Sequence, residues 1–143
     1  MTFRPTFLPA AAALLFCASL ATAQDSEPDV DCVSAVTQMD MNICADRDYQ
    51  EADAALNAAY KKALSAARAM DDELGDISAA YVGAVEALKR AQRAWIGYRD
   101  GQCELAGFEA RGGSMEPMLV SGCLAELPRK RTEELKAVYE QAE

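Results

Sequence analysis

The chain has 143 residues, enough for one domain with a modest core once any targeting segment is removed. It carries 14 basic and 23 acidic residues, a net charge of −9, and this balance argues against binding to nucleic acid or to an anionic membrane surface, since both depend on basic groups. Because the chain has no histidine, the commonest general base and the commonest metal ligand are absent, and we expect no enzyme, no metal site and no cofactor.

The first 23 residues have the order of a secretory signal peptide. Arg4 precedes an apolar run from Phe7 to Leu20, and the small residues Ala21-Thr22-Ala23 follow it. The run is short for a membrane span, which takes about 20 apolar residues. We therefore predict cleavage near Ala23, no membrane span in the mature protein, and a location in the periplasm or outside the cell. Residues 24–31 are expected to be a flexible lead to one helical domain over 32–143.

A first helix is predicted from Gln38 to about Met70. Thr37 is placed to cap it, with Asp40 three residues later in a near capping box. An apolar stripe at spacings of three and four follows, comprising Tyr49, Ala52, Leu56, Ala59, Ala63, Ala67 and Met70. The acids and glycine of residues 71–76 predict a connection after it.

A second helix is predicted to reach about Phe108. Its stripe again alternates spacings of four and three, through Tyr81, Val85, Leu88, Gln92, Trp95 and Arg99. Two helices of roughly 30 residues are each about 45 Å long, and a short connection makes them antiparallel neighbours. The predicted core is a long helical hairpin.

The C-terminal part predicts one or two further helices. Residues 111–114 form a glycine-containing loop, and a short helix is expected over Met115–Glu126. Pro128 predicts a break, followed by a last helix whose apolar face comprises Leu127, Arg131, Leu135, Val138 and Ala142. The fold class is therefore all-α.

Four cysteines remain after Cys17 leaves with the signal, namely Cys32, Cys44, Cys103 and Cys123. An even set in an exported chain indicates disulfides, and the gaps are too wide for a usual zinc site. We prefer Cys32 with Cys44, because the lead can double back over the first helical turns, and Cys103 with Cys123, which closes the glycine loop. A Cys44–Cys103 pair stays open, since both lie at equal height in a hairpin turning near residue 74.

Several runs together resemble the LprI-like lysozyme inhibitor family, also called the domain of unknown function 1311. They cover nearly all of the mature chain and are the segment Cys32 to Cys44, Tyr49-x3-Asp53-x2-Leu56-Asn57-x2-Tyr60, Ala91-Gln92-Arg93-Ala94-Trp95-Ile96-x-Tyr98-Arg99-Asp100-x2-Cys103, Gly113-Ser114, and Cys123-x3-Leu127. The resemblance implies an all-helical exported domain whose named activity is lysozyme inhibition. Pro128 departs from the family's pattern, which has threonine there, and this leaves the direction of the last helix open.

A structural polar cluster is predicted where the two long helices face each other. Trp95 and Arg99 share the second stripe, and the hairpin register places them at the levels of Asp53 and Tyr49. Because a buried charge must be paired, we expect Arg99 or Arg93 to bind Asp53 or Asn57. The cluster of Asp53, Asn57, Trp95 and Arg99 is expected to support stability.

The glycine loop is the candidate contact with a lysozyme. Lysozyme cleaves its glycan with two carboxylates in a cleft, so a cation and a hydroxyl on a narrow loop have the chemistry to occupy it. Arg111 and Ser114 supply these groups. The alternative is a plain connector that needs glycine for its turn.

The sequence thus predicts an exported, non-enzymatic protein-binding domain, with lysozyme inhibition as its leading function. Signal removal takes Arg4, so the mature chain has 13 basic and 23 acidic residues, a net charge of −10, which would attract a basic lysozyme. The alternative function is a structural or assembly module of the envelope. An enzyme could draw only on carboxylates such as Asp48, Glu51, Asp100 and Glu104, which are better explained as a solvated face.

Overall fold

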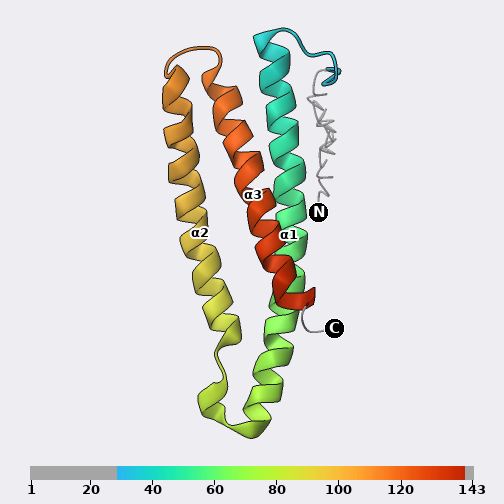
Figure 1. Ribbon diagram of the computed structural model, residues 1–143, viewed down its shortest axis with the longest axis vertical. Coiled ribbons are helices and arrows are strands. Elements are labelled where there is room, and N and C mark those ends of the chain that lie inside the picture. Colours follow the sequence, from blue (N-terminus) through green and yellow to red (C-terminus); the bar gives the residue numbers. More distant parts are fainter. Residues whose placement is uncertain (1–28, 141–143) are drawn as a thin grey trace, which may run out of the picture.

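The computed structural model describes residues 29–140, and the predicted signal peptide, its cleavage site, residues 24–28 of the lead and Ala142 lie outside that range. The described chain is all-α, as predicted. Its elements are α1 (Gln38–Ile77), the 3-10 turn η1 (Ala79–Tyr81), α2 (Ala84–Gly107), the 3-10 turn η2 (Phe108–Ala110) and α3 (Glu116–Glu140). α2 runs antiparallel to α1, and α3 returns in the direction of α1 and packs on both (Figure 1).

The start of α1 is the predicted one. The Thr37 hydroxyl accepts a hydrogen bond from the Asp40 N–H at 3.1 Å, which satisfies one of the free donors of the first turn. The predicted end is wrong, because α1 continues through residues 71–76 to Ile77. One glycine costs a helix only about 1 kcal/mol, and the uninterrupted helix carries Asp71 to the beginning of α2, where its carboxylate is used.

The core lies between α1 and α3 more than between α1 and α2. Ala52, Leu56, Ala59, Ala63 and Ala67 are buried along α1, and Leu135 of α3 packs against this stripe. Small alanine side chains let the two helices approach closely. The antiparallel course of the predicted hairpin is confirmed, but α3 fills most of the space that the prediction gave to α2.

The two predicted stripes are exposed, and not buried, at the ends that approach the turn between α1 and α2. Met70 is 43% exposed and Tyr81, which lies in η1 and not in α2, is 60% exposed. The reason is the length of α3, whose last residues, Tyr139 and Glu140, lie beside Ser65 and Ala66 of α1. Beyond that level α1 has no third helix to cover it in the described chain.

The C-terminal region is one helix, so the break predicted at Pro128 is wrong. α3 runs for 25 residues with Pro128 inside it. The proline ring is among the most buried side chains of the protein, and the Thr132 hydroxyl donates to the Pro128 carbonyl at 2.8 Å. Tertiary packing therefore retains a residue that an isolated helix would reject.

Two disulfides tie the ends of these elements. Cys32 is bonded to Cys44, with 5.5 Å between their Cα atoms, and joins the N-terminal segment to the second turn of α1. Cys103 is bonded to Cys123, at a Cα separation of 5.3 Å, and joins α2 to α3. This is the preferred pairing of the two that the sequence left open. Across residues 29–140, no helix has both the length and the apolarity that a membrane crossing needs.

Candidate functional site

The loop between α2 and α3, here the glycine loop (residues 108–115), begins where these two helices lie in close contact. A Cβ on Gly107 would lie 2.7 Å from the Val120 Cγ2, so only glycine permits this approach. Gly112 has a φ of 77°, in the left-handed region that favours glycine. The Gly113 N–H donates to the Ala110 carbonyl at 2.8 Å and closes the turn.

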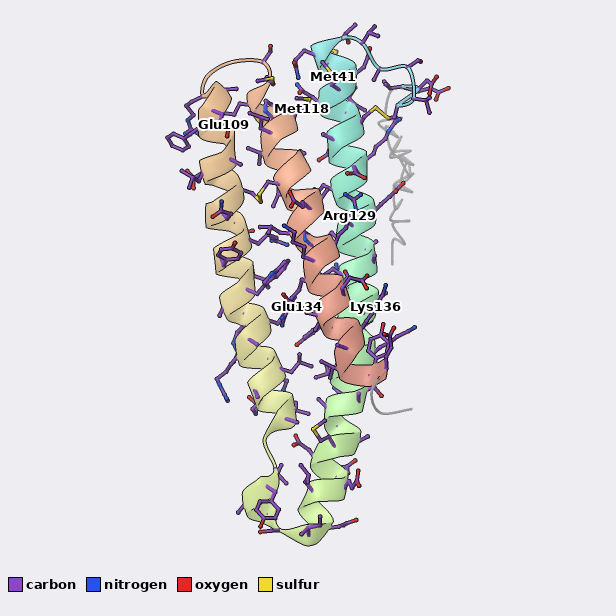
Figure 2. The ribbon with its side chains drawn as sticks, viewed as in Figure 1. Met41, Glu109, Met118, Arg129, Glu134 and Lys136 are labelled. Carbon is purple, nitrogen blue, oxygen red and sulfur yellow. A yellow bond between two sulfur atoms is a disulfide. The ribbon has the colours of Figure 1, made fainter. Side chains whose placement is uncertain are left out.

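Glu116 holds the loop in place from the first turn of α3. One carboxylate oxygen accepts from the Arg111 guanidinium at 2.8 Å and the other from the Gly112 N–H at 2.7 Å. From α1, the Asn42 amide donates to the Ser114 carbonyl at 3.0 Å. Met41 and Met118 lie at the same end of the bundle (Figure 2). The loop is thus fixed by contacts from two helices, and neither Asn42 nor Glu116 was among the predicted site residues.

Arg111 and Ser114, the predicted partner-binding residues, are both exposed at this end of the bundle. The Arg111 guanidinium lies 4.5 Å from the centre of the Phe108 ring in addition to its ion pair with Glu116. The Arg111 side chain is 55% exposed. The Glu116 side chain is 24% exposed, so the guanidinium is the more accessible partner of this ion pair.

The four residues of the predicted polar cluster come together midway along the bundle. Arg99 lies 3.5 Å from an Asp53 carboxylate oxygen and 2.7 Å from one of Asp100. The Asn57 amide donates to Asp53 at 2.7 Å, and the Arg99 guanidinium is 5.4 Å from the Trp95 ring centre. Trp95 in turn packs on the core. Of the two arginines considered, it is Arg99 that reaches Asp53.

A second carboxylate site, missed by the sequence reasoning, joins the ends of α1 and α2. Asp71 accepts hydrogen bonds from the N–H groups of Gly83 and Ala84, both at 2.7 Å, and from that of Val85 at 3.0 Å. The Gly83 and Val85 contacts, and then that of Ala84, lower the pKa of the Asp71 carboxyl. The sequence could have indicated this site only through a missing cap. Gly83 has no side chain to cap α2, so the free N–H groups in the first turn of α2 need a partner from another part of the chain.

The carboxylates considered for catalysis do not form a site. Asp48 pairs with Arg129, which Figure 2 shows on the side of α3 toward α1, and Asp100 pairs with Arg99. Glu51 and Glu104 are exposed on different helices. Among residues 29–140, no three acidic, cysteine or histidine side chains come together as a metal site would require.

Comparison with known proteins gives three similarities. The family model described as lysozyme inhibitor LprI matches residues 31–135. An uncharacterized protein of Rhizobium meliloti is 70% identical over 135 residues, which cover 94% of this chain and 96% of the relative. A crystal structure of a DUF1311-family protein from Pseudomonas putida has the same fold, with a TM-score of 0.59 and 24% identity over 74% of this chain and 96% of the other.

Proposed function

Because the chain belongs to the LprI family of lysozyme inhibitors, we propose that it is exported and inhibits lysozyme by binding to it, without an enzymatic activity of its own. The observation that carries this proposal is the family match, which spans residues 31–135 and so includes the three helices almost completely. The signal-like first 23 residues support export. The two disulfides support it as well, since such bonds persist in oxidising compartments.

The glycine loop is the proposed contact with lysozyme. It is narrow, exposed and held by Glu116 and Asn42, so that binding would order few further groups. Arg111 presents a guanidinium that suits the catalytic carboxylates of a lysozyme cleft, and Ser114 places a hydroxyl three residues later. The net charge of −10 on the mature chain would also speed encounter with a basic lysozyme.

The test is a titration of an animal-type lysozyme with the oxidised mature protein. We expect lysozyme activity on bacterial cell walls to fall with added protein. Arg111→Ala should raise the inhibition constant by about tenfold or more, the effect of removing an arginine from the centre of an interface. Arg68→Ala, which removes an exposed arginine from α1 far from the loop, is the matched control and should leave the constant unchanged.

Two negative results have different meanings. If the unmodified protein leaves lysozyme fully active, the inhibitor function is wrong, and the alternative of an envelope assembly module takes its place. If it inhibits and Arg111→Ala inhibits equally well, the function stands and the glycine loop is only a connector. A thermal melt of each variant separates a lost contact from a lost fold.

A further inference from the structure

α2 has a second apolar face, opposite to the one that packs in the bundle. It comprises six residues of α2 and the first residue of η2, spaced alternately by four and three and all exposed: Ala87, Ala91, Ala94, Tyr98, Gly101, Leu105 and Phe108. Tyr98, Leu105 and Phe108 are 56%, 61% and 54% exposed. We call this set the outer face of α2. Its buried opposite side includes Cys103 and Gly107.

The outer face of α2 has the pattern of a two-stranded coiled coil. Apolar positions that alternate by four and three form a seam along one side of a helix, and a partner helix normally covers it. No charged residue interrupts the seam. α2 lies at one edge of the bundle, so in the described chain neither α1 nor α3 covers this side (Figure 1).

We infer that the outer face of α2 packs against the same face of a second copy of the chain, with the two α2 helices antiparallel about a two-fold axis. In that register Tyr98 and Leu105 each meet an alanine, and two small residues meet at Gly101. Tyr98 lies opposite Ala94 of the second copy, Leu105 opposite its Ala87, and Gly101 opposite its Ala91. A parallel pair would instead stack tyrosine on tyrosine and alanine on alanine, which prevents even spacing of the two helices.

The charges beside the seam favour the same antiparallel arrangement. Arg90 and Glu104 lie on one flank of the outer face, each seven residues from Gly97, and both are exposed. Antiparallel helices pair these positions with each other, so Arg90 of each copy faces Glu104 of the other. A two-fold axis forms this ion pair twice. The self-complementary charge pattern is what identifies a second copy, and not an unrelated protein, as the partner.

The oligomeric mass of the oxidised mature protein tests this inference, which does not depend on lysozyme inhibition. Sedimentation equilibrium over a range of micromolar concentrations should give the mass of a dimer that dissociates on dilution. Leu105→Glu places a charge in the seam of each copy and should weaken dimerisation by about tenfold or more, with the helical circular dichroism unchanged. Ile77→Glu is the matched control, because Ile77 is 70% exposed but lies away from the outer face.

A charge exchange tests the antiparallel register. Arg90→Glu and Glu104→Arg should each weaken the dimer by about threefold to tenfold, whereas the double variant should restore it, since the pair is re-formed with its signs reversed. A monomer mass at every concentration overturns the inference. So does a double variant weaker than both single ones, or a Leu105→Glu variant that loses lysozyme binding while its mass stays that of the unmodified protein.

Discussion

Asp71 shows how one side chain links two helices at the far end of the bundle. It belongs to α1, yet its carboxylate accepts the first N–H groups of α2, where the positive end of the helix dipole lies. Gly83, at the cap position of α2, makes no side-chain bond. Asp71, which lies 12 residues before Gly83 in the sequence, therefore supplies the helix cap that the residues next to α2 lack.

Asp71→Asn should lower the melting temperature at neutral pH, because the amide carries no negative charge and has one accepting oxygen where the carboxylate uses both. The pKa of Asp71 is lowered in the folded state, so the unfolded chain binds its proton more readily. The stabilisation is present above the unfolded pKa of about 3.9 and is lost as the pH falls through the lower folded pKa. Melting curves of both proteins should therefore differ at pH 7 and converge below about pH 4. A difference in melting temperature that stays constant from pH 7 to below pH 4 would contradict the conclusion that the charged Asp71 carboxylate caps α2.

The residues that sequence reasoning placed well are those related by the register of one hairpin. Asp53 and Arg99 could be paired because two antiparallel helices with a turn near residue 74 bring Asp53 to the level of Trp95, one helical turn from Arg99, within reach of the long arginine side chain. Glu116 and Asp71 could not be found in this way. Both carboxylates accept from backbone N–H groups, and Glu116 also from the Arg111 side chain. Whether these groups are within reach depends on where neighbouring helices begin and on how a loop turns, and apolar periodicity predicts neither.

At the scale of the helices, apolar spacing located the buried faces but not the partners that bury them. The stripe from Ala52 to Ala67 is buried as expected, but it packs chiefly on α3. A stripe of alanines suits any close helix, so it does not distinguish α2 from α3. Helix ends were predicted less well for a related reason: residues 71–76 and Pro128 disfavour helix locally, and tertiary contacts outweigh that preference.

Pro128→Ala measures how these two effects balance within α3. An interior proline costs a helix about 3 kcal/mol relative to alanine. Losing two ring carbons from a buried site costs about 1.6 kcal/mol, and a residual cavity adds to this loss. We therefore expect a net gain of roughly 1 kcal/mol, seen as a melting temperature a few degrees higher.

Pro117→Ala is the control for that experiment. Pro117 lies exposed in the first turn of α3, where the missing N–H has no partner to lose, and its replacement should leave the melting temperature nearly unchanged. A lower melting temperature for Pro128→Ala would show that packing of the ring outweighs the helix preference.

Within residues 29–140 the core of the molecule contains few large side chains. Leu56 and Leu135 are buried, and most other buried apolar residues are alanines. A core of this kind buries little area for each ordered residue, so cross-links matter more than they would in a larger domain. The two disulfides differ in this respect, since one ties two core helices and the other ties the N-terminal segment to the start of α1.

The disulfides should accordingly open in a fixed order under a mild dithiol reductant. Cys32 is exposed, and the Arg47 guanidinium lies 3.8 Å from its sulfur, which favours its release as a thiolate. Cys103 is only 1% exposed. Alkylation followed by mass spectrometry should therefore show Cys32 and Cys44 modified first, while Cys103 and Cys123 stay bonded until the helices separate.

The double variant Cys103→Ser/Cys123→Ser should lose roughly 2 to 4 kcal/mol of stability. Cys32→Ser/Cys44→Ser should lose less, because α1 keeps its Thr37 cap and its packing on α3. Simultaneous opening of the two disulfides would contradict the predicted order of reduction. The reverse order of stability loss would mean that the link of the N-terminal segment to α1 stabilises the bundle more than the α2–α3 link.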